Sequence, residues 1–406
     1  MKASMNLPPA ITEAEIRRFR AETPAADAGR IHLNNAGASL MPVSVLSAIR
    51  DHLDLESKLG GYEAADAAAS AVSHVYDSIA TLVGAQREHI AIIENATVAV
   101  AQALSAFDFR AGDVLLTTRN DYISNQLMYL SLARRTGLRV ERAADASEGG
   151  VDPDSIRQLV RQHRPKLVAL TWVPTNSGLV QPAEAVGEIC AAEDVPFLVD
   201  GCQAAGQLPI DVHRLQCDFL AATGRKFMRG PRGTGFLFVS PKMLEAGLYP
   251  RFLDMRGARW LQADEFELAP DATRFENWEF SYALVLGLGQ AVDYALDIGL
   301  DRIAARVSEL ATYAREKLGA LNGVRVLDRG ARLCGIVTAE IAGHEARSVM
   351  LRLREEAINT SATAREFAVL DMDDKRADTA LRVSPHYYNT RREIDILSSA
   401  LEEFTT

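Results

Sequence analysis

The sequence is short of the features that mark secreted, membrane-bound and nucleic-acid-binding proteins. Its first residues, MKASMNLPPAITEAEIRRF, contain no continuous apolar segment, so we expect no secretory signal. No apolar run in the chain is long enough to cross a bilayer. The formal net charge is −10, and no basic tract breaks the mixture of acidic and basic residues. These absences predict a cytoplasmic protein that binds neither nucleic acid nor membrane.

The chain also lacks the patterns of a metal site or a disulfide framework. Its four cysteines have no CxxC spacing, and its eight histidines are scattered. We therefore expect reduced, mostly buried thiols and no bound metal.

What the chain does contain is a regular alternation of apolar runs with amphipathic stretches. A length of 406 residues fits a large domain and a smaller one. Strands alternating with helices predict an α/β fold with a mostly parallel sheet in the large domain, residues 30–265. From about Arg274 the pattern changes, and residues 1–29 and 266–406 are predicted to form a smaller α+β domain.

Several polar side chains fall where predicted strands end. They are Asn95 to Thr97, Tyr122, Asn176, Asp200 and Gln203. In open parallel sheets ligands gather beyond the carboxyl ends of the strands, so we expect these side chains to surround one site.

Lys226 is the leading catalytic candidate. It follows a predicted strand in the segment ATGRKFMRGPRGTG, and Asp200 closes the apolar run VPFLVD upstream. A lysine amine condenses with the aldehyde of pyridoxal 5′-phosphate (PLP), and a carboxylate keeps the pyridine nitrogen of PLP protonated. The pair therefore predicts a PLP-dependent enzyme.

The phosphate of that cofactor is expected at the start of the helix after Asn95, where unpaired N–H groups favour an anion. Asn95 can equally cap this helix. Thr223 and Arg225 flank Lys226 and offer a hydroxyl and a guanidinium to the phosphate. A surface salt bridge is the other interpretation of Arg225, and the two stay open.

The remaining candidates concern the cofactor ring and the substrate. Gln203 can donate to the phenolic O3′, and Tyr122 can stack on the ring face, although an aromatic there is commonly core. Arg382, on a predicted strand of the small domain, can hold an α-carboxylate through two parallel hydrogen bonds. His386 is expected to be structural.

Seven segments, taken in chain order, resemble the class V (cysteine desulfurase-like) branch of fold-type I PLP enzymes. They are HLNNAGASLMP, ENATVAV, VPTNSGLVQP, FLVDGCQAAGQLPIDV, CDFLAATGRKFMRGPRGTGFLFV, RFENWE and LRVSPHYYNTRREID. The resemblance implies an amino-acid substrate and a homodimer with active sites at the subunit interface. It assigns Lys226 as Schiff-base lysine, Asp200 as pyridinium partner, Gln203 as O3′ partner, Ala96, Thr97 and Thr223 as phosphate ligands, Asn176 as ring-side and substrate-binding asparagine, and Arg382 as carboxylate clamp.

The departures from that family bear on the reaction. Arg225 and Tyr122 stand where cysteine desulfurases usually carry histidines, and RFENWE replaces their RFE-x-G-T. No cysteine lies between Asn359 and Arg382, where a desulfurase carries the thiol that receives sulfur as a persulfide. A persulfide-forming cysteine desulfurase is therefore disfavoured on sequence.

The segment KLGGYEAADAAA is similar to the matching stretch of hercynylcysteine sulfoxide lyases. We therefore expect an enzyme that forms an external aldimine and a Cα carbanion, with β-elimination as the first choice. A class V aminotransferase or an amino-acid epimerase is the alternative, because all three reactions share the carbanion.

Overall fold

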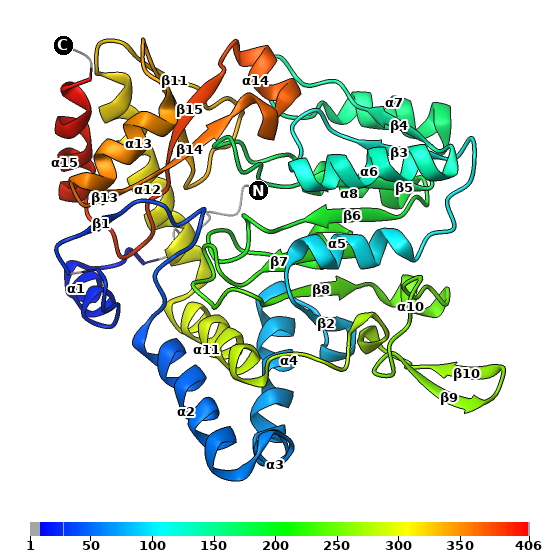
Figure 1. Ribbon diagram of the computed structural model, residues 1–406. Coiled ribbons are helices and arrows are strands. Elements are labelled where there is room, and N and C mark those ends of the chain that lie inside the picture. Colours follow the sequence, from blue (N-terminus) through cyan, green and yellow to red (C-terminus); the bar gives the residue numbers. More distant parts are fainter. Residues whose placement is uncertain (1–8, 27, 405–406) are drawn as a thin grey trace, which may run out of the picture.

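The computed structural model describes residues 9–26 and 28–404. At its centre is a seven-stranded sheet in the order β2-β8-β7-β6-β5-β3-β4 (Figure 1). The strands are β2 (Ile90–Ile93), β3 (Val114–Thr117), β4 (Arg139–Arg142), β5 (Leu167–Thr171), β6 (Phe197–Asp200), β7 (Phe219–Thr223) and β8 (Gly235–Val239). Only β8 runs antiparallel to its neighbours, which confirms the predicted α/β fold.

Alternate side chains of the strands enter two apolar layers. Ile90 and Ile92 belong to one layer, whereas Ala91 and Ile93 belong to the other. Helices α5 (Ala96–Ser105), α6 (Ile123–Thr136) and α10 (Pro241–Glu245) cover the second layer. The first is covered by α4 (Ala69–Val83), α7 (Pro153–His163), α8 (Ala183–Ala192), α9 (Val212–Leu215) and α11 (Tyr282–Ile298). Because both faces are buried, the ligand-binding space lies at the strand ends.

A second, antiparallel sheet has the order β11-β12-β15-β14. Its strands are β11 (Val324–Val326), β12 (Val337–Ile341), β14 (Ser361–Ala364) and β15 (Thr379–Val383). Helices α12 (Leu300–Gly319), α13 (Ala346–Glu355) and α15 (Arg391–Glu402) pack on it through Leu310, Leu353 and Leu397. The short helix α14 (Val369–Lys375) lies between β14 and β15. These elements form the predicted α+β part of the chain.

The N-terminal segment joins this smaller part. Strand β1 (Ile31–His32) pairs with β13 (Ile358–Asn359). Helix α1 (Glu13–Ala21) is capped by Thr12, and Arg20 reaches Glu393 at 3.0 Å. Thus residues at the start of the chain pack against residues near its end.

The predicted domain boundary at 265/266 falls inside a hairpin. Strands β9 (Ala258–Gln262) and β10 (Glu265–Leu268) form this hairpin, which projects from the large sheet (Figure 1). Helix α11, placed in the small domain on sequence, packs against α2 (Val43–Leu59) and α4 of the large one. The division into domains stays a prediction. The remaining short helices are α3 (Gly61–Ala67), η1 (Arg87–His89), η2 (Ala272–Phe275) and η3 (Arg365–Phe367).

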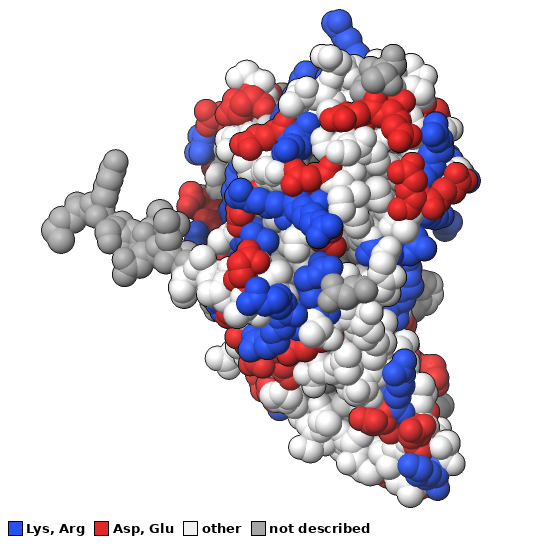
Figure 2. Space-filling view, turned by 90° about the vertical axis from the view of Figure 1, so that its left-hand side faces the viewer, with Lys and Arg blue, Asp and Glu red and all other residues white. Residues whose placement is uncertain are grey.

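Acidic and basic side chains lie side by side on the face that Figure 2 shows. Ion pairs join α12 to α15, for example Arg391 to Glu309 at 2.8 Å and Lys317 to Asp395 at 3.1 Å. Among the described residues no single helix is long and apolar enough to span a membrane. Helices α11 and α12 pass such a test only as a pair bent by 82°.

Candidate active site

A cavity of about 250 Å³ opens at the carboxyl ends of β5, β6 and β7. Five residues predicted from the sequence line it together with Lys226, namely Ala96, Thr97, Tyr122, Asp200 and Gln203. Thr223 and Arg225 also line it. The structure therefore places the predicted strand-end residues at one cavity, with the exception of Asn176.

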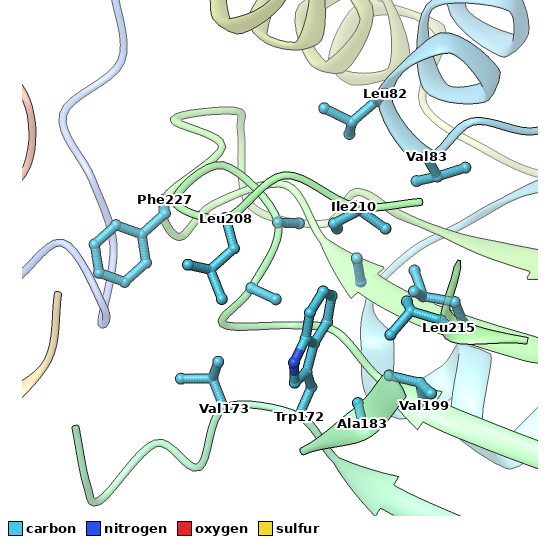
Figure 3. Close-up of a cluster of buried hydrophobic side chains, with 14 of the residues drawn as sticks. Leu82, Val83, Trp172, Val173, Ala183, Val199, Leu208, Ile210, Leu215 and Phe227 are labelled. Carbon is cyan, nitrogen blue, oxygen red and sulfur yellow. The ribbon is translucent and has the colours of Figure 1, made fainter. Parts of the chain in front are cut away.

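Lys226 stands on a rigid turn. Strand β7 ends at Thr223, and the residues that follow Lys226, Phe227 and Met228, are almost completely buried. Figure 3 shows Phe227 close to Leu208, in an apolar cluster that also contains Trp172 and Ile210. Anchoring on both sides fixes where the Lys226 amine points.

His386 reinforces that anchor from the small domain. Its Nε2 lies 2.8 Å from the carbonyl oxygen of Phe227, and its Nδ1 accepts the Tyr387 N–H at 2.9 Å. Because Nδ1 accepts, Nε2 carries the proton and donates to Phe227. Burial and the Arg229 charge lower the pKa of His386 to about 3, so the ring is neutral. This is the structural role expected for it.

The Lys226 amine faces an aromatic ring and a carboxylate. Its Nζ lies 5.8 Å from the centroid of Tyr122, and its charge partly offsets the burial that raises the pKa of Asp200. Asp200 closes β6 and accepts hydrogen bonds from Asn125 Nδ2 at 2.8 Å and from the Cys202 N–H at 2.9 Å. A buried carboxylate held in this way needs a cationic partner, and a pyridinium nitrogen supplies one.

A second buried carboxylate, Asp121, lies beside Tyr122. Asp121 accepts hydrogen bonds from Thr117 at 2.8 Å, from the Tyr122 N–H at 2.7 Å and from Thr171. Burial and the nearby Asp200 raise the pKa of Asp121. Asp121 thereby fixes the backbone from which the Tyr122 ring projects.

The start of α5 forms the cavity wall beside Thr223. Asn95 Oδ1 accepts the N–H of Val98 at 3.0 Å, so Asn95 caps the helix. Ala96 and Thr97 lie in the first turn of α5 and line the cavity, and their N–H groups have no carbonyl acceptor within the helix. The capping interpretation holds for Asn95, and the geometry still suits a phosphate.

Gln203 and Arg382 meet at Thr175. Gln203 Nε2 donates to Thr175 Oγ1 at 2.8 Å, and Arg382 Nη1 donates to the same oxygen at 2.8 Å and to the Thr175 carbonyl at 2.9 Å. The Gln203 Oε1 and the Arg382 Nε are buried without a partner in the described part of the protein. With the amide in this orientation, Gln203 would accept from the O3′ rather than donate to it. These orphaned polar atoms are consistent with a ligand.

Asn176 is not brought to the cavity. Its Nδ2 donates to Asp371 of α14 at 2.6 Å, and Lys375 donates to the same carboxylate oxygen at 2.7 Å. The buried acid therefore draws the amide toward the small domain, and Thr175 occupies the place at the cavity that was predicted for Asn176. This corrects the placement of Asn176.

Arg225 points toward the N-terminal loop. Its guanidinium donates to the carbonyl of Gly37, and its charge adds to the burial that lowers the pKa of Arg382 to about 10. Among the described residues Arg225 forms no salt bridge, so the surface salt bridge is not found. Arg225 lines the cavity, and its contact with the cofactor phosphate stays a prediction.

Seven further residues that line the cavity escaped the sequence analysis. They are Asn125, Thr171, Val173, Thr175, Cys202, Arg232 and Gly233. Asn125 lies one helical turn after Tyr122, and Cys202 lies between Asp200 and Gln203, so local spacing carried a signal for both. All four cysteines fall in the described part of the chain and are free thiols, and three are buried.

The residues present fit PLP. A lysine, a buried carboxylate, a flat aromatic ring and a helix N-terminus converge on one cavity, as a fold-type I PLP site requires. The fold and this site therefore define the class as a PLP-dependent enzyme.

Comparison with known proteins identifies the family. Residues 31–397 match the family described as Aminotransferase class-V, and the chain belongs to that family. A probable cysteine desulfurase of Methanothermobacter thermautotrophicus is 27% identical over 92% of this chain and 94% of its own. The apo structure of a cysteine desulfurase from Thermococcus onnurineus has a TM-score of 0.87 at 25% identity and covers 99% of both chains. A variant of C-DES with glycine covalently linked to its PLP cofactor has a TM-score of 0.84 at 23% identity, over 95% of this chain and 99% of its own.

These names correct the expected reaction. The sequence analysis placed β-elimination first and disfavoured cysteine desulfuration, yet relatives that match over 92% of the chain are named cysteine desulfurases. The preference for a hercynylcysteine sulfoxide lyase-like reaction is therefore wrong.

Proposed function

We propose that this protein uses PLP to remove sulfur from cysteine and to release alanine. The observation that carries the proposal is the placement of the Lys226 amine in one cavity with Tyr122 and Asp200. The substrate class is supported by the relatives named cysteine desulfurases.

When bound, PLP withdraws electrons from the substrate Cα. The protein residues have separate tasks. Lys226 removes the proton from Cα and holds it, so Lys226 acts as the general base. Asp200, held by Asn125 and the Cys202 N–H, keeps the ring nitrogen protonated. Arg382 has an unpartnered Nε with which to bind the α-carboxylate.

The sulfur acceptor is a separate thiol molecule. Residues 359–381 contain no cysteine. Cys202 is the cysteine that lines the cavity, and burial raises the pKa of its thiol, so it is protonated and a poor nucleophile. In the proposed reaction the Cβ–S bond of cysteine breaks and an S–S bond forms with the acceptor R–SH. The products are alanine, whose Cβ gains the proton, and the persulfide R–S–SH.

The test supplies the PLP-loaded enzyme with cysteine and a small thiol and measures alanine, pyruvate and pyridoxamine phosphate. We expect alanine and an equal amount of persulfide sulfur, and none from Lys226→Ala. The matched variant Cys202→Ser should retain alanine formation, because the acceptor comes from outside. Pyruvate in place of alanine, or full activity of Lys226→Ala, would refute the proposal.

Transamination is the second candidate, and the lack of a cysteine in residues 359–381 favours it. It predicts stoichiometric pyridoxamine phosphate without alanine in the same assay. The two reactions differ in their second substrate, because desulfuration requires a thiol acceptor whereas transamination requires a keto acid.

We also propose a homodimer. Large apolar side chains near the β9–β10 hairpin are exposed, with Phe252 at 83%, Met255 at 69% and Trp260 at 79%. A second copy of the chain would cover such a surface. Sedimentation at micromolar concentration tests it, and a monomer there would contradict it. The cytoplasmic location stays a prediction.

A further inference from the structure

The hydroxyl of Thr175 accepts hydrogen bonds from two neighbours at the wall of the active-site cavity. Its Oγ1 lies 2.8 Å from Gln203 Nε2 and 2.8 Å from Arg382 Nη1. The guanidinium of Arg382 can only donate. The orientation of the Gln203 amide is fixed too, because the same Nε2 reaches the Ala36 carbonyl at 3.1 Å, and a carbonyl oxygen requires an N–H. Both neighbours therefore donate to the Thr175 hydroxyl.

The proton of the Thr175 hydroxyl is left for a ligand. A hydroxyl has two lone pairs and one O–H, and the two donors occupy both lone pairs. Among residues 9–26 and 28–404, this hydroxyl bonds to Gln203 and Arg382 alone, and it is the acceptor in both bonds. Thr175 lines the cavity, so the cavity is where the O–H can find an acceptor.

The charge around Thr175 favours an anion as that acceptor. Thr175 lines the cavity, and the buried Arg382 bonds both to its hydroxyl and, at 2.9 Å, to its carbonyl. In the described part of the chain no aspartate or glutamate forms an ion pair with Arg382. A hydroxyl that accepts from a guanidinium is polarised and becomes a stronger donor. Thr175 can thus transmit the charge of Arg382 to the cavity.

Two anions enter this site in the proposed reaction, the cofactor phosphate and the substrate carboxylate. Three cations (Lys226, Arg225 and Arg232) line the cavity together with one acid, Asp200, so the wall has positive charge for both anions. The start of α5 suits the phosphate. The carboxylate matches Thr175, because the Thr175 hydroxyl is bonded to the arginine proposed for that carboxylate.

We propose that Thr175 binds the α-carboxylate of the substrate through its O–H, with Arg382 bonded behind it. Thr175 then takes a contact that the resemblance assigned to Asn176. The inference deepens the proposed function by adding a substrate-binding residue, and it rests on that function only in that the substrate is an α-amino acid.

Asp371 on α14 is the positioning residue for Thr175. Residues 175 and 176 lie in a turn after β5. Asn176 is buried and donates to Asp371 at 2.6 Å, and the buried Lys375 donates to the same oxygen at 2.7 Å. Because this contact holds Asn176 away from the cavity, its neighbour Thr175 faces the cavity.

Two non-reacting probes isolate the carboxylate. They are 2-methylalanine, which has no Cα proton to lose, and isopropylamine, the same molecule with hydrogen in place of the carboxylate. Calorimetry on the PLP-loaded enzyme gives both dissociation constants. We expect wild type to bind 2-methylalanine at least about tenfold more tightly, because hydrogen bonds to charged groups are the strong ones. Thr175→Val keeps the shape of the side chain without the hydroxyl and should lower that preference about tenfold.

Two hydroxyl variants are the comparisons for Thr175→Val. Thr175→Ser keeps the hydroxyl and should keep the preference. Ser177→Ala removes a hydroxyl two residues away that lines a different cavity, and it should also keep the preference. Retained preference in Thr175→Val, or lost preference in either comparison variant, would overturn the assignment.

The positioning role of Asp371 has its own signature. Asp371→Ala and Asn176→Ala should each lower the preference, and the double variant should lower it no further, because both residues act through one contact. Asp373→Ala removes an exposed carboxylate of the same helix, paired with Arg365 at 2.8 Å, and should change nothing. A far greater loss in Asn176→Ala than in Asp371→Ala would mean that Asn176 itself contacts the substrate, and the positioning role would fall.

Two further outcomes are distinguishable. If the Thr175 hydroxyl faced the phenolic oxygen of the cofactor instead, Thr175→Val would shift the visible absorbance band of the ligand-free PLP enzyme and keep the carboxylate preference, and our assignment would be wrong. Failure of the proposed function alone would leave the preference and its loss in Thr175→Val intact, while wild type formed no alanine from cysteine.

Discussion

The buried imidazole of His386 gives the protein an acid-sensitive stability that can be worked out in advance. The ring is fully buried, donates to the Phe227 carbonyl and accepts from the Tyr387 N–H. Its pKa is about 3 in the fold, against an ordinary value of 6.5. A proton on Nδ1 would break the bond to Tyr387 and place a charge beside Arg229.

The sign follows from where protons bind. Between pH 6.5 and 3 the unfolded chain holds a proton on this histidine and the folded protein does not, so lowering the pH favours unfolding. Each pKa unit is worth about 1.4 kcal/mol. Lowering the pH from 7 to 5 should therefore remove about 2 kcal/mol of unfolding free energy through this group alone.

The assay compares wild type with His386→Gln by urea denaturation at pH 7 and pH 5, both loaded with PLP. Glutamine can still donate to the Phe227 carbonyl but does not titrate. Other groups with shifted pKa, such as His32, are common to both proteins and cancel in the comparison. Wild type should lose about 2 kcal/mol more than the variant over this interval. Parallel losses would show that His386 does not stay neutral in the fold.

Two further substitutions probe the support of the site. Asn125→Ala removes the 2.8 Å hydrogen bond to Asp200, and because bonds to charged groups contribute about 1.5–3 kcal/mol, the dissociation constant of PLP should rise roughly 10- to 100-fold. Fluorescence titration measures it, and unchanged affinity would mean that Asp200 needs no such support. Gly206→Ala would place a Cβ 2.3 Å from the Phe227 carbonyl carbon at φ +89°, so we expect a loss of about 3 kcal/mol or more in denaturation. Gly247→Ala has the same left-handed backbone with open space around it, and should cost only about 1 kcal/mol; equal losses would argue against the contact.

The sequence predicted the parts of the site that depend on strand ends. Asp200 and Tyr122 each follow a short apolar run, and the parallel sheet brings such ends to one edge. Prediction from the sequence failed where a shift of one residue changes the direction in which a side chain points. Thr175 and Asn176 are adjacent, yet one faces the cavity and the other bonds to Asp371, which is distant in the chain. No local sequence pattern indicates which of these two side chains will bond to the acid on α14.

The domain boundary could not be predicted from local sequence patterns either. Helix α11 has the apolar pattern of any core helix, and the sequence does not reveal whether α4 or the small sheet will cover it. Its packing on α2 and α4 depends on glycines, because a Cβ at Gly287 would come within 2.6 Å of Ile49 and one at Gly289 within 2.7 Å of Val75. Such close approach is a property of the partner surface, which appears only once the chain has folded.

The substrate side of the cavity is built across the two sheets. Arg382 projects from β15 of the small sheet, and its hydrogen bonds go to Thr175 after β5 of the large sheet and to Asn34 on the N-terminal loop. Arg225 follows β7 and bonds to the same loop through Gly37. The cofactor side, by contrast, is held within the large sheet by Asp200. Evolution of the substrate side can therefore change specificity through the loop and β15 without disturbing the residues that hold PLP, which is how one family of folds can serve several amino-acid reactions.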